Sequence, residues 1–483
     1  MTIDLSQIDP DAVKVVQRLR RFGHEAYLVG GCVRDLLLGR KPKDFDVSTS
    51  ATPPELRRLF RNCRIIGRRF RLAHIFFGPK IFETSTFRAN PREGEDEEKG
   101  EATPDDLLIR RDNVFGNAEQ DAQRRDFTVN GLFLDPETGH VTDYVNGLAD
   151  IEARTVRTIG DPDIRFREDP IRILRAVKFA ARCGLSIEPE TLRCMVEHAQ
   201  EISKCAQARV SEEFFRLLRA GAAHRSMELL VELQLLPVLM PALEAWRTGA
   251  AAPGMHPGPL REVEDAEPSD PSFTETLDTG AEPAPDAGGE RGADPQRLWS
   301  YLDALDQVTL GDDGAPSNAV VIATLVMPWL YPLLLPESGV RDASRPILGA
   351  LRPFMEQLRI SKRDAENTRQ LLLVLRHFIP SRQPARKRPP RINNRDLAAD
   401  LTWMVKVIAK AEAIELEGLP SIEPPEPVRE PVGLSTPSAP RVAGGLSPIP
   451  TLPESWHRNE VRPRFLGTGA FGTSIGGAWR YAD

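Results

Sequence analysis

Two tracts of this chain cannot bury a hydrophobic core, and they confine the folded part to the segments beside them. Residues 247–296 are rich in proline, glycine, alanine and acidic residues, and the chain from residue 419 is again rich in proline and glycine. Segments with so few apolar residues do not offset the entropy that is lost on folding. We therefore expect a disordered acidic linker over 247–296 and a disordered tail over 419–483.

The segment before residue 150 has the pattern of a mixed α/β domain. Ala26–Val29, Phe45–Thr49 and Phe127–Leu134 read as strands, and a helix is expected at Pro53–Arg61 because Thr52 precedes it as a cap with proline in the first turn. Further paired strands are expected at Ile75–Phe77 and Phe82–Phe87, and a return strand at Val141–Tyr144.

The later folded segments read as helical. Pro170–Cys183 carries apolar residues at helical spacing and stops at Gly184, and Ser211–Arg219 reads as a helix with Ser211 as its cap. Together with the linker and the tail, these patterns predict three folded domains: a mixed α/β domain over 1–150, a helical domain over 151–246 and a second helical domain over 297–418.

The charge of the chain is unevenly distributed. The net charge is −7, but residues 261–294 contain eleven acidic residues and two arginines, and residues 93–106 contain eight acidic residues and one lysine. Without these two segments the net charge becomes +9. Because phosphate attraction acts over roughly 8–10 Å, the local charge decides, and the rest of the chain is basic enough for an RNA partner.

Cysteine usage and hydropathy indicate a reduced compartment away from membranes. The five cysteines are an odd number with no CxxC pair, which is typical of free thiols in a cytoplasmic protein. The longest apolar stretch, Ala319–Leu335, is interrupted by Pro328 and is too short to span a bilayer. The first eleven residues lack the apolar core of a secretory signal.

A glycine pair between a strand and a helix is the first motif with chemical meaning. In Gly30-Gly31-Cys32-Val33-Arg34-Asp35 the glycines allow backbone N–H groups to approach a phosphate, and Arg34 offers a forked donor for the same anion. A lone Gly-Gly is more often only a tight turn, so the motif needs support from its neighbours.

Two aspartates follow at the start of the next strand. In Asp44-Phe45-Asp46 the carboxylates occupy positions i and i+2, which face the same side of a strand, and such a pair repels unless a divalent cation neutralises it. Magnesium prefers oxygen ligands of this kind together with substrate phosphates. The spacing predicts a metal site at Asp44 and Asp46.

A third motif, Arg124-Arg125-Asp126-Phe127-Thr128, places two arginines and a carboxylate before the expected strand Phe127–Leu134. Arg125 is expected to contact a triphosphate. Asp126 either completes the metal site or positions the arginines, and Glu83 competes with it for the role of third carboxylate.

These motifs, in this order, resemble the class II tRNA nucleotidyltransferase and bacterial poly(A) polymerase family. The segment Arg167-Glu168-Asp169-Pro170-Ile171-Arg172-Ile173-Leu174-Arg175-Ala176 is similar to a fourth motif of that family. The likeness is strong over roughly residues 20–240. It implies a DNA polymerase beta-like nucleotidyltransferase head over 1–150. It also implies a helical neck over 151–246 that binds RNA and recognises the base, and a helical body and tail domain over 297–418 that binds RNA.

The resemblance also implies site roles. Asp44, Asp46 and Asp126 would be catalytic, with two Mg²⁺ ions at Asp44 and Asp46 and ATP as the substrate. Gly30, Gly31, Arg34, Arg125 and Arg175 would contact the nucleotide. We expect Asp169 and Arg172, three residues apart on one helix face, to read the base through its amino group and its ring nitrogen, which admits adenine and cytosine but not guanine or uracil.

The same motifs leave three functions open. Addition of adenylates to RNA 3′ ends is favoured, because Ile65–Ile75 resembles a signature of bacterial poly(A) polymerases and a basic cluster spans Arg376–Arg395. The alternatives are a CCA-adding tRNA nucleotidyltransferase and an RNA-binding paralogue without catalysis. The intact carboxylates Asp44, Asp46 and Asp126 argue against the paralogue.

Overall fold

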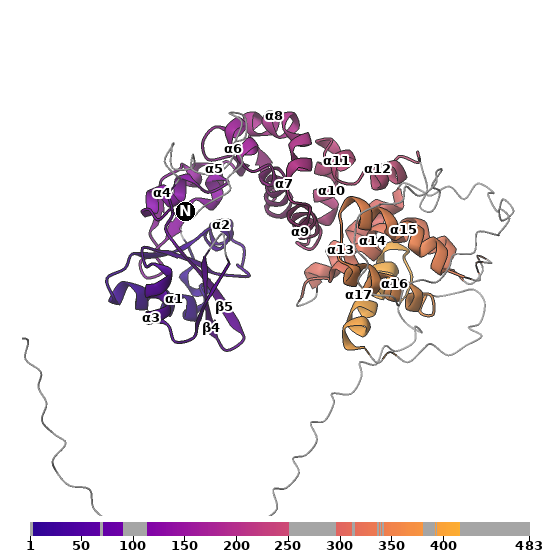
Figure 1. Ribbon diagram of the computed structural model, residues 1–483, viewed down its shortest axis with the longest axis horizontal. Helices are drawn as coiled ribbons and strands as arrows, with labels where there is room; N and C mark the ends of the chain where they lie inside the picture. The colour runs from indigo at the N-terminus through magenta and orange to yellow at the C-terminus, as the bar shows by residue number, and fades with distance from the viewer. Residues whose placement is uncertain are drawn as a thin grey trace, which may run out of the picture. The chain divides into compact units, whose positions relative to one another are not determined.

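A computed structural model describes residues 3–67, 71–89, 114–250, 296–311, 314–335, 338, 340, 342–379, 392 and 394–415 (Figure 1). All of them belong to one compact unit, Met1–Glu426. Residues 251–295 of the expected linker, the expected tail and the acidic segment 93–106 lie outside the described residues. The domain boundaries stay predictions.

A seven-stranded sheet forms the N-terminal part of the described chain, in the order β3-β4-β5-β2-β1-β6-β7. The β2–β5 pair is parallel and the other neighbours are antiparallel. The strands are β1 (Ala26–Val29), β2 (Asp46–Thr49), β3 (Cys63–Ile66), β4 (Leu72–Phe77), β5 (Lys80–Thr86), β6 (Leu132–Leu134) and β7 (Val141–Asp143). The expected β4–β5 pair is confirmed, and β3 is a strand that we did not expect.

Local capping signals fix the helices around this sheet. In α3 (Pro53–Leu59) Thr52 and Glu55 form a reciprocal capping box, as the Thr52 signal predicted. The others are α1 (Pro10–Arg21), α2 (Gly31–Leu37), α4 (Ala118–Gln123) and α5 (Gly147–Glu152), with short 3₁₀ turns η1 (Leu5–Gln7) and η2 (Thr128–Asn130).

The prediction of a strand over Phe127–Leu134 was wrong. Thr128–Asn130 forms the 3₁₀ turn η2, and only Leu132–Leu134 is strand. Gly131 follows this turn in close packing, where an added Cβ would lie 2.6 Å from a methyl group of Val145. The turn directs the Asn130 side chain toward Arg34 and Asp126.

The middle of the chain is helical, with one small parallel sheet of β8 (Thr155–Val156) and β9 (Ser186–Ile187). Its elements are α6 (Pro162–Glu168), α7 (Ile171–Cys183), α8 (Pro189–Glu197), η3 (Ala199–Lys204), α9 (Gln207–Leu218), α10 (Ala223–Glu232), α11 (Leu236–Leu239) and α12 (Pro241–Arg247). Helix α7 ends at Gly184, which has φ 64° as a left-handed cap.

Ser211 is not the cap of its helix, which corrects our prediction. Helix α9 begins four residues earlier, at Gln207, and the Ser211 hydroxyl donates to the Gln207 carbonyl inside the helix at 2.9 Å. Serine can satisfy its hydroxyl in this way within a helix, so a serine followed by an acidic residue does not by itself mark a helix start.

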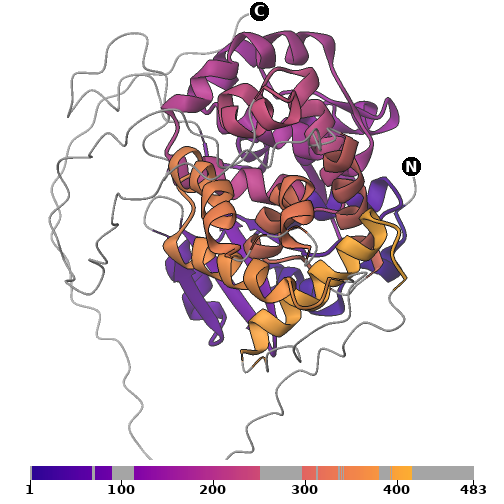
Figure 2. The same cartoon turned by 90° about the vertical axis from the view of Figure 1, so that its right-hand side faces the viewer.

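Five further helices pack on one another: α13 (Gln296–Gly311), α14 (Asn318–Leu334), α15 (Ser344–Gln357), α16 (Lys362–Leu375) and α17 (Arg395–Ala411). They lie together in both views (Figures 1 and 2). The apolar stretch at Ala319 is α14, which is buried on nearly all sides at the centre of this bundle. In the described ranges no helix has both the length and the apolar character needed to cross a lipid bilayer.

Candidate functional site

A cavity of about 1000 Å³ brings the predicted motifs together. The sheet side of the cavity contributes the Gly30-Gly31 turn, Asp46, Arg125 and Asp126, and the helical side contributes residues of α7 and α9. Ten basic side chains and five carboxylates line it, so it attracts anions. The basic side chains are Arg34, Lys43, Arg125, Arg172, Arg175, Lys178, Arg182, Arg209, Arg216 and Arg219.

The Gly30-Gly31 turn exposes backbone to this cavity. Gly30 has φ 72° and ψ −129°, a conformation that side-chain-bearing residues rarely adopt. A Cβ at Gly30 would lie 3.3 Å from a terminal nitrogen of Arg125, so the glycine also permits the close approach of this arginine. The turn between β1 and α2 is where we expected it, although α2 begins two residues before the expected start at Val33.

Asp46 is a largely buried carboxylate without a strong cationic partner. Burial is the main cause that raises the pKa of Asp46 to about 6; the Glu83 and Asp44 charges raise it further, and Arg125 lowers it. An ionised carboxylate in this place is costly unless a cation joins it. The register of β2 and β5 explains the role of Glu83, because Val47 pairs with Thr84 and the two acidic residues precede that pair.

Asp44 does not line the cavity that Asp46 lines. Strand β2 begins at Asp46, so the same-face rule that predicted convergence does not reach Asp44. Asp44 is exposed and borders a neighbouring cavity of about 530 Å³ with Lys41 and Lys43. Among the described residues no three His, Cys, Asp or Glu side chains converge as a metal-ligand group. The metal site at Asp44 and Asp46 stays a prediction.

Arg34 lines the cavity, and neighbouring side chains fix its guanidinium in place. Its guanidinium donates to Asp35 Oδ1 from Nε at 3.0 Å and from Nη2 at 2.7 Å, and to Asn130 Oδ1 at 2.7 Å. The residue is 1% exposed, and its guanidinium lies 4.7 Å from the centre of the Phe179 ring. These contacts fix the start of α2 against α7, and contact between Arg34 and a phosphate stays a prediction.

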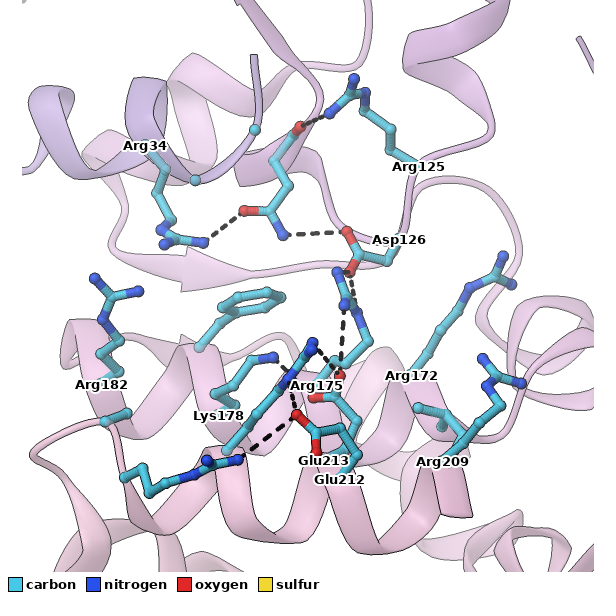
Figure 3. A pocket seen from close by; sticks show the side chains of 18 of the residues that line it. Arg34, Arg125, Asp126, Arg172, Arg175, Lys178, Arg182, Arg209, Glu212 and Glu213 are labelled. Atoms are coloured by element: carbon cyan, nitrogen blue, oxygen red, sulfur yellow. Dashed lines mark hydrogen bonds and ion pairs between the residues drawn. The ribbon is translucent and has the colours of Figure 1, made fainter. Parts of the chain in front are cut away.

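Arg125 and Asp126 point in different directions from adjacent positions. Arg125 donates to Asp121 Oδ2 at 2.9 Å and to the Asn130 carbonyl at 3.3 Å. Asp126 Oδ2 accepts from Nε and Nη2 of Arg175 at 2.7 and 2.6 Å, an ion pair between the sheet side and α7 (Figure 3). Burial raises the pKa of Asp126, but the Arg175 charge and hydrogen bonds from Asn130 and Arg175 outweigh it and hold the pKa well below its usual range.

Both oxygens of Asp126 are therefore engaged. Oδ1 accepts from the Phe127 N–H at 2.9 Å and from Asn130 Nδ2 at 3.1 Å. The arginine that Asp126 holds is Arg175 and not one of the two arginines of its own motif that we expected, and the choice between Asp126 and Glu83 as third carboxylate stays a prediction. Glu83 acts directly on the charge of Asp46.

Asp169 and Arg172 line the cavity, but they do not share a helix, which corrects our prediction. Helix α6 ends at Glu168, Asp169 has φ −152° and ψ 88°, and α7 begins at Ile171. Pro170 is the cause, because a residue before proline is driven out of the helical region. Asp169 instead pairs with Arg209 of α9 at 2.8 Å, and Arg172 pairs with Glu168 at 3.0 Å.

Several cavity residues were absent from our sequence predictions. Lys178 and Arg182 continue from the predicted Arg175 at spacings of three and four on α7, so the helical period was a usable signal for these two residues. Glu213 of α9 accepts from Lys178 at 2.8 Å and lies 3.9 Å from Arg175, and these two contacts have no local sequence signal (Figure 3). Asn130 was hidden in the wrongly expected strand.

Comparisons with known proteins agree with the fold and the site described above. The family model described as the poly A polymerase head domain matches residues 26–157, and the one described as a probable RNA and SrmB-binding site of polymerase A matches residues 184–247. Poly(A) polymerase I of Salmonella typhimurium is 47% identical over 246 residues, which are 51% of this chain and 53% of that protein. Poly(A) polymerase I of Haemophilus influenzae is 46% identical over 49% of this chain and 53% of that protein. The chain thus spans about half the length of these relatives.

Enzymes with another name are more distant. The CCA-adding enzyme of Levilactobacillus brevis is 38% identical over 44% of this chain and 51% of that protein. Among solved structures, the CCA-adding enzyme of Bacillus stearothermophilus in complex with CTP has a TM-score of 0.51 and 22% identity, over 83% of this chain and 78% of that one. At this identity the likeness shows the fold, a nucleotidyltransferase head followed by helical domains, which confirms our fold prediction.

Proposed function

We propose that this chain belongs to the family of class II tRNA nucleotidyltransferases and poly(A) polymerases, and that it adds adenylates from ATP to RNA 3′ ends without a template. The observation that carries the proposal is the shared cavity: Asp46, a partly buried carboxylate at the start of β2, lines it together with the base-reading candidates of the helical side. The 47% identity to poly(A) polymerases against 38% to a CCA-adding enzyme supports adenylate addition over CCA addition.

The RNA 3′-hydroxyl oxygen would attack the α-phosphorus of ATP. The bond between the α-phosphorus and the oxygen that bridges to the β-phosphate breaks, pyrophosphate leaves, and the hydroxyl proton passes to solvent. The Gly30-Gly31 turn and Arg125 lie on the sheet side of the cavity, where they would hold the triphosphate. Arg34, which also lines the cavity, would support that contact with the triphosphate.

The donor set at Asp46 fits a divalent cation. The raised pKa of Asp46, caused first by burial and then by the Glu83 charge, marks a site where positive charge is lacking. Carboxylate oxygens are the ligands that Mg²⁺ prefers, so Asp46, Asp44 and Glu83 would hold it. Bound there, Mg²⁺ would supply the positive charge that favours an ionised hydroxyl and a leaving pyrophosphate. Asp126 would keep Arg175 in place.

Base choice would depend on Asp169 and Arg172, which come from two different helix ends. A carboxylate accepts from the amino group of adenine while a guanidinium donates to the adjacent ring nitrogen, and guanine and uracil present the opposite pattern. The break at Pro170 gives Asp169 an extended backbone, and Arg209 restrains its carboxylate. The pair does not separate adenine from cytosine.

The RNA partner and the cytoplasmic location belong to the same proposal. Basic residues outnumber carboxylates two to one around the cavity, which suits an RNA phosphate backbone. All five cysteines are free thiols, as in a reducing compartment. Three residues of the Ile65–Ile75 signature, 68–70, and most of the basic cluster after Arg376 lie outside the described residues.

Primer extension with Mg²⁺ tests the proposal. ATP or CTP is offered separately to a generic RNA and to a tRNA that lacks its 3′ CCA, with Asp46→Asn as the inactive control. Long tails from ATP alone on both RNAs are expected. Addition of two C residues and one A to the tRNA only would assign the CCA-adding function instead, and RNA binding without any incorporation would assign the non-catalytic paralogue.

A further inference from the structure

Arg165 on α6 lies between the sheet side and the helical side of the cavity. Its Nη2 donates to the carbonyl oxygens of Arg124 and Arg125 at 2.7 and 2.5 Å, and its Nη1 donates to Glu168 Oε2 at 2.8 Å. The residue is 6% exposed and does not line the cavity itself. One guanidinium thus connects the backbone of the triphosphate-binding candidate with the end of α6.

The same Glu168 oxygen also holds the base-reading candidate. Arg172 Nη1 donates to Glu168 Oε2 at 3.0 Å and to the Arg165 carbonyl at 2.8 Å. Both contacts of Arg172 therefore go to α6, and α6 is joined to Arg124 and Arg125 through Arg165. A movement of α6 away from the sheet would carry Arg172 with it.

This arrangement is costly for a role in packing alone. Two guanidinium groups share one carboxylate oxygen in a buried place, and Nε of Arg165 is buried without a hydrogen-bond partner in the described part of the chain. Burial, followed by the nearby Arg172 charge, lowers the pKa of Arg165. An apolar side chain would fill the same space at lower cost, so the hydrogen bonds of the planar fork are the property that distinguishes arginine here.

We propose that Arg165 is a positioning residue for nucleotide selectivity: it fixes the distance between the base-reading Arg172 and the triphosphate-binding Arg125. The inference rests on the proposed function, because it assigns a use to the same nucleotide site. With that distance fixed, α6 cannot shift to offer hydrogen-bond partners to a base whose donors and acceptors are opposite to those of adenine. With Arg165 replaced, α6 and Arg172 can adapt to such a base.

The test compares two conservative variants with the full-length chain. Arg165→Lys keeps the charge but loses the fork that reaches two carbonyls and Glu168 together. Arg193→Lys is the matched control, because Arg193 is exposed on α8 and pairs only with its helix neighbours Glu190 and Glu197 among the described carboxylates. Addition of AMP and of GMP to one RNA primer gives kcat/KM for each nucleotide, and thermal unfolding gives Tm.

Arg165→Lys is expected to lower the ratio of kcat/KM for ATP to that for GTP by about tenfold, the value of a hydrogen bond to a charged group, while Arg193→Lys leaves it unchanged. An equal loss for both nucleotides, with the ratio unchanged, would show a merely structural role and overturn the proposal. If Arg165→Lys does not fold, Glu168→Gln takes its place with the same expected ratio. If the wild-type chain adds no nucleotide, the proposed function fails, and equilibrium binding of ATP and GTP decides the inference.

Discussion

The two sides of the cavity differ most clearly at one carboxylate. On the sheet side Arg34, Arg125 and Asp126 are paired, but no ion pair joins Asp46 among the described residues. Burial first and then the Glu83 charge raise the pKa of Asp46 to about 6. On the helical side, nearly every charge has a close partner: Asp169 with Arg209, Glu168 with Arg172, and Glu213 with Lys178.

This difference indicates a division of labour. An uncompensated carboxylate is a poor contributor to folding and a good ligand for a cation, whereas paired side chains hold a fixed shape. We infer that the sheet side carries the chemical step and the helical side carries recognition. Variants on each side can sharpen or break this contrast.

The largest effect is expected from Asp46→Asn. If Asp46 binds the metal as proposed, loss of its carboxylate removes several kcal/mol of transition-state stabilisation, and the rate of AMP addition should fall by about a thousandfold. Because the pKa of Asp46 is raised in the fold, its ionised form destabilises the metal-free protein increasingly from pH 3.8 to about 6 and constantly above. The variant should therefore have a higher Tm than the wild type at pH 8.

Single-turnover kinetics and thermal unfolding without Mg²⁺ check both parts. Asp11→Asn, at a carboxylate of α1 that pairs with Lys14 and Lys80, is the control: it should leave the rate of AMP addition unchanged and should not raise the Tm. A stable variant with undiminished addition of AMP would remove Asp46 from the chemical step.

A smaller effect is expected from Asp126→Asn, which removes the nearest counter-ion of Arg175 and leaves Glu213 at 3.9 Å. Breaking a buried ion pair costs about 3 kcal/mol, toward the lower end here because the Arg175 side chain is 33% exposed. The folded-state pKa of Asp126 is lowered, so its stabilising contribution is present above the unfolded value of 3.8 and is lost as the pH falls below it.

Urea unfolding at pH 7 and at pH 3 measures this effect. The difference in the free energy of unfolding between wild type and Asp126→Asn should shrink at pH 3. An equal difference at both pH values would show that the Asp126 charge does not join the two sides of the cavity.

The smallest effect is expected from Asn130→Ala. Its side chain joins Arg34 at 2.7 Å to Asp126 at 3.1 Å, and removal of a buried partner costs about 1–3 kcal/mol. Because Arg34 and Asp126 both lie on the sheet side, KM for ATP should rise without a change in the preference for ATP over GTP. Steady-state kinetics with both nucleotides measure this effect, and a changed preference for ATP over GTP would contradict the assignment.

Local signals predicted much of the sheet side. The Gly30-Gly31 turn, the capping box at Thr52 and the β4–β5 pair depend on residues close in sequence, so their types and spacings were enough. The helical side depends on distant partners. Asp126 meets Arg175 across 49 positions, and no periodicity in a single sequence encodes such a contact.

The break between α6 and α7 was predictable and was missed. Pro170 is the signal for a helix break in the sequence, but we predicted one helix that carries both Asp169 and Arg172. The turn at Asn130 was not predictable in the same way, since the Asn130 side chain bonds to Arg34, which lies 96 positions away in the sequence.

The most direct test of the division of labour crosses one variant from each side with two measurements. Asp46→Asn and Arg172→Ala are compared for equilibrium binding of ATP and GTP and for the rate of nucleotide addition to RNA. We predict that Asp46→Asn binds ATP in preference to GTP but does not add it, and that Arg172→Ala still adds nucleotides but has lost the preference. Loss of the ATP preference in Asp46→Asn, or its retention in Arg172→Ala, would contradict the account.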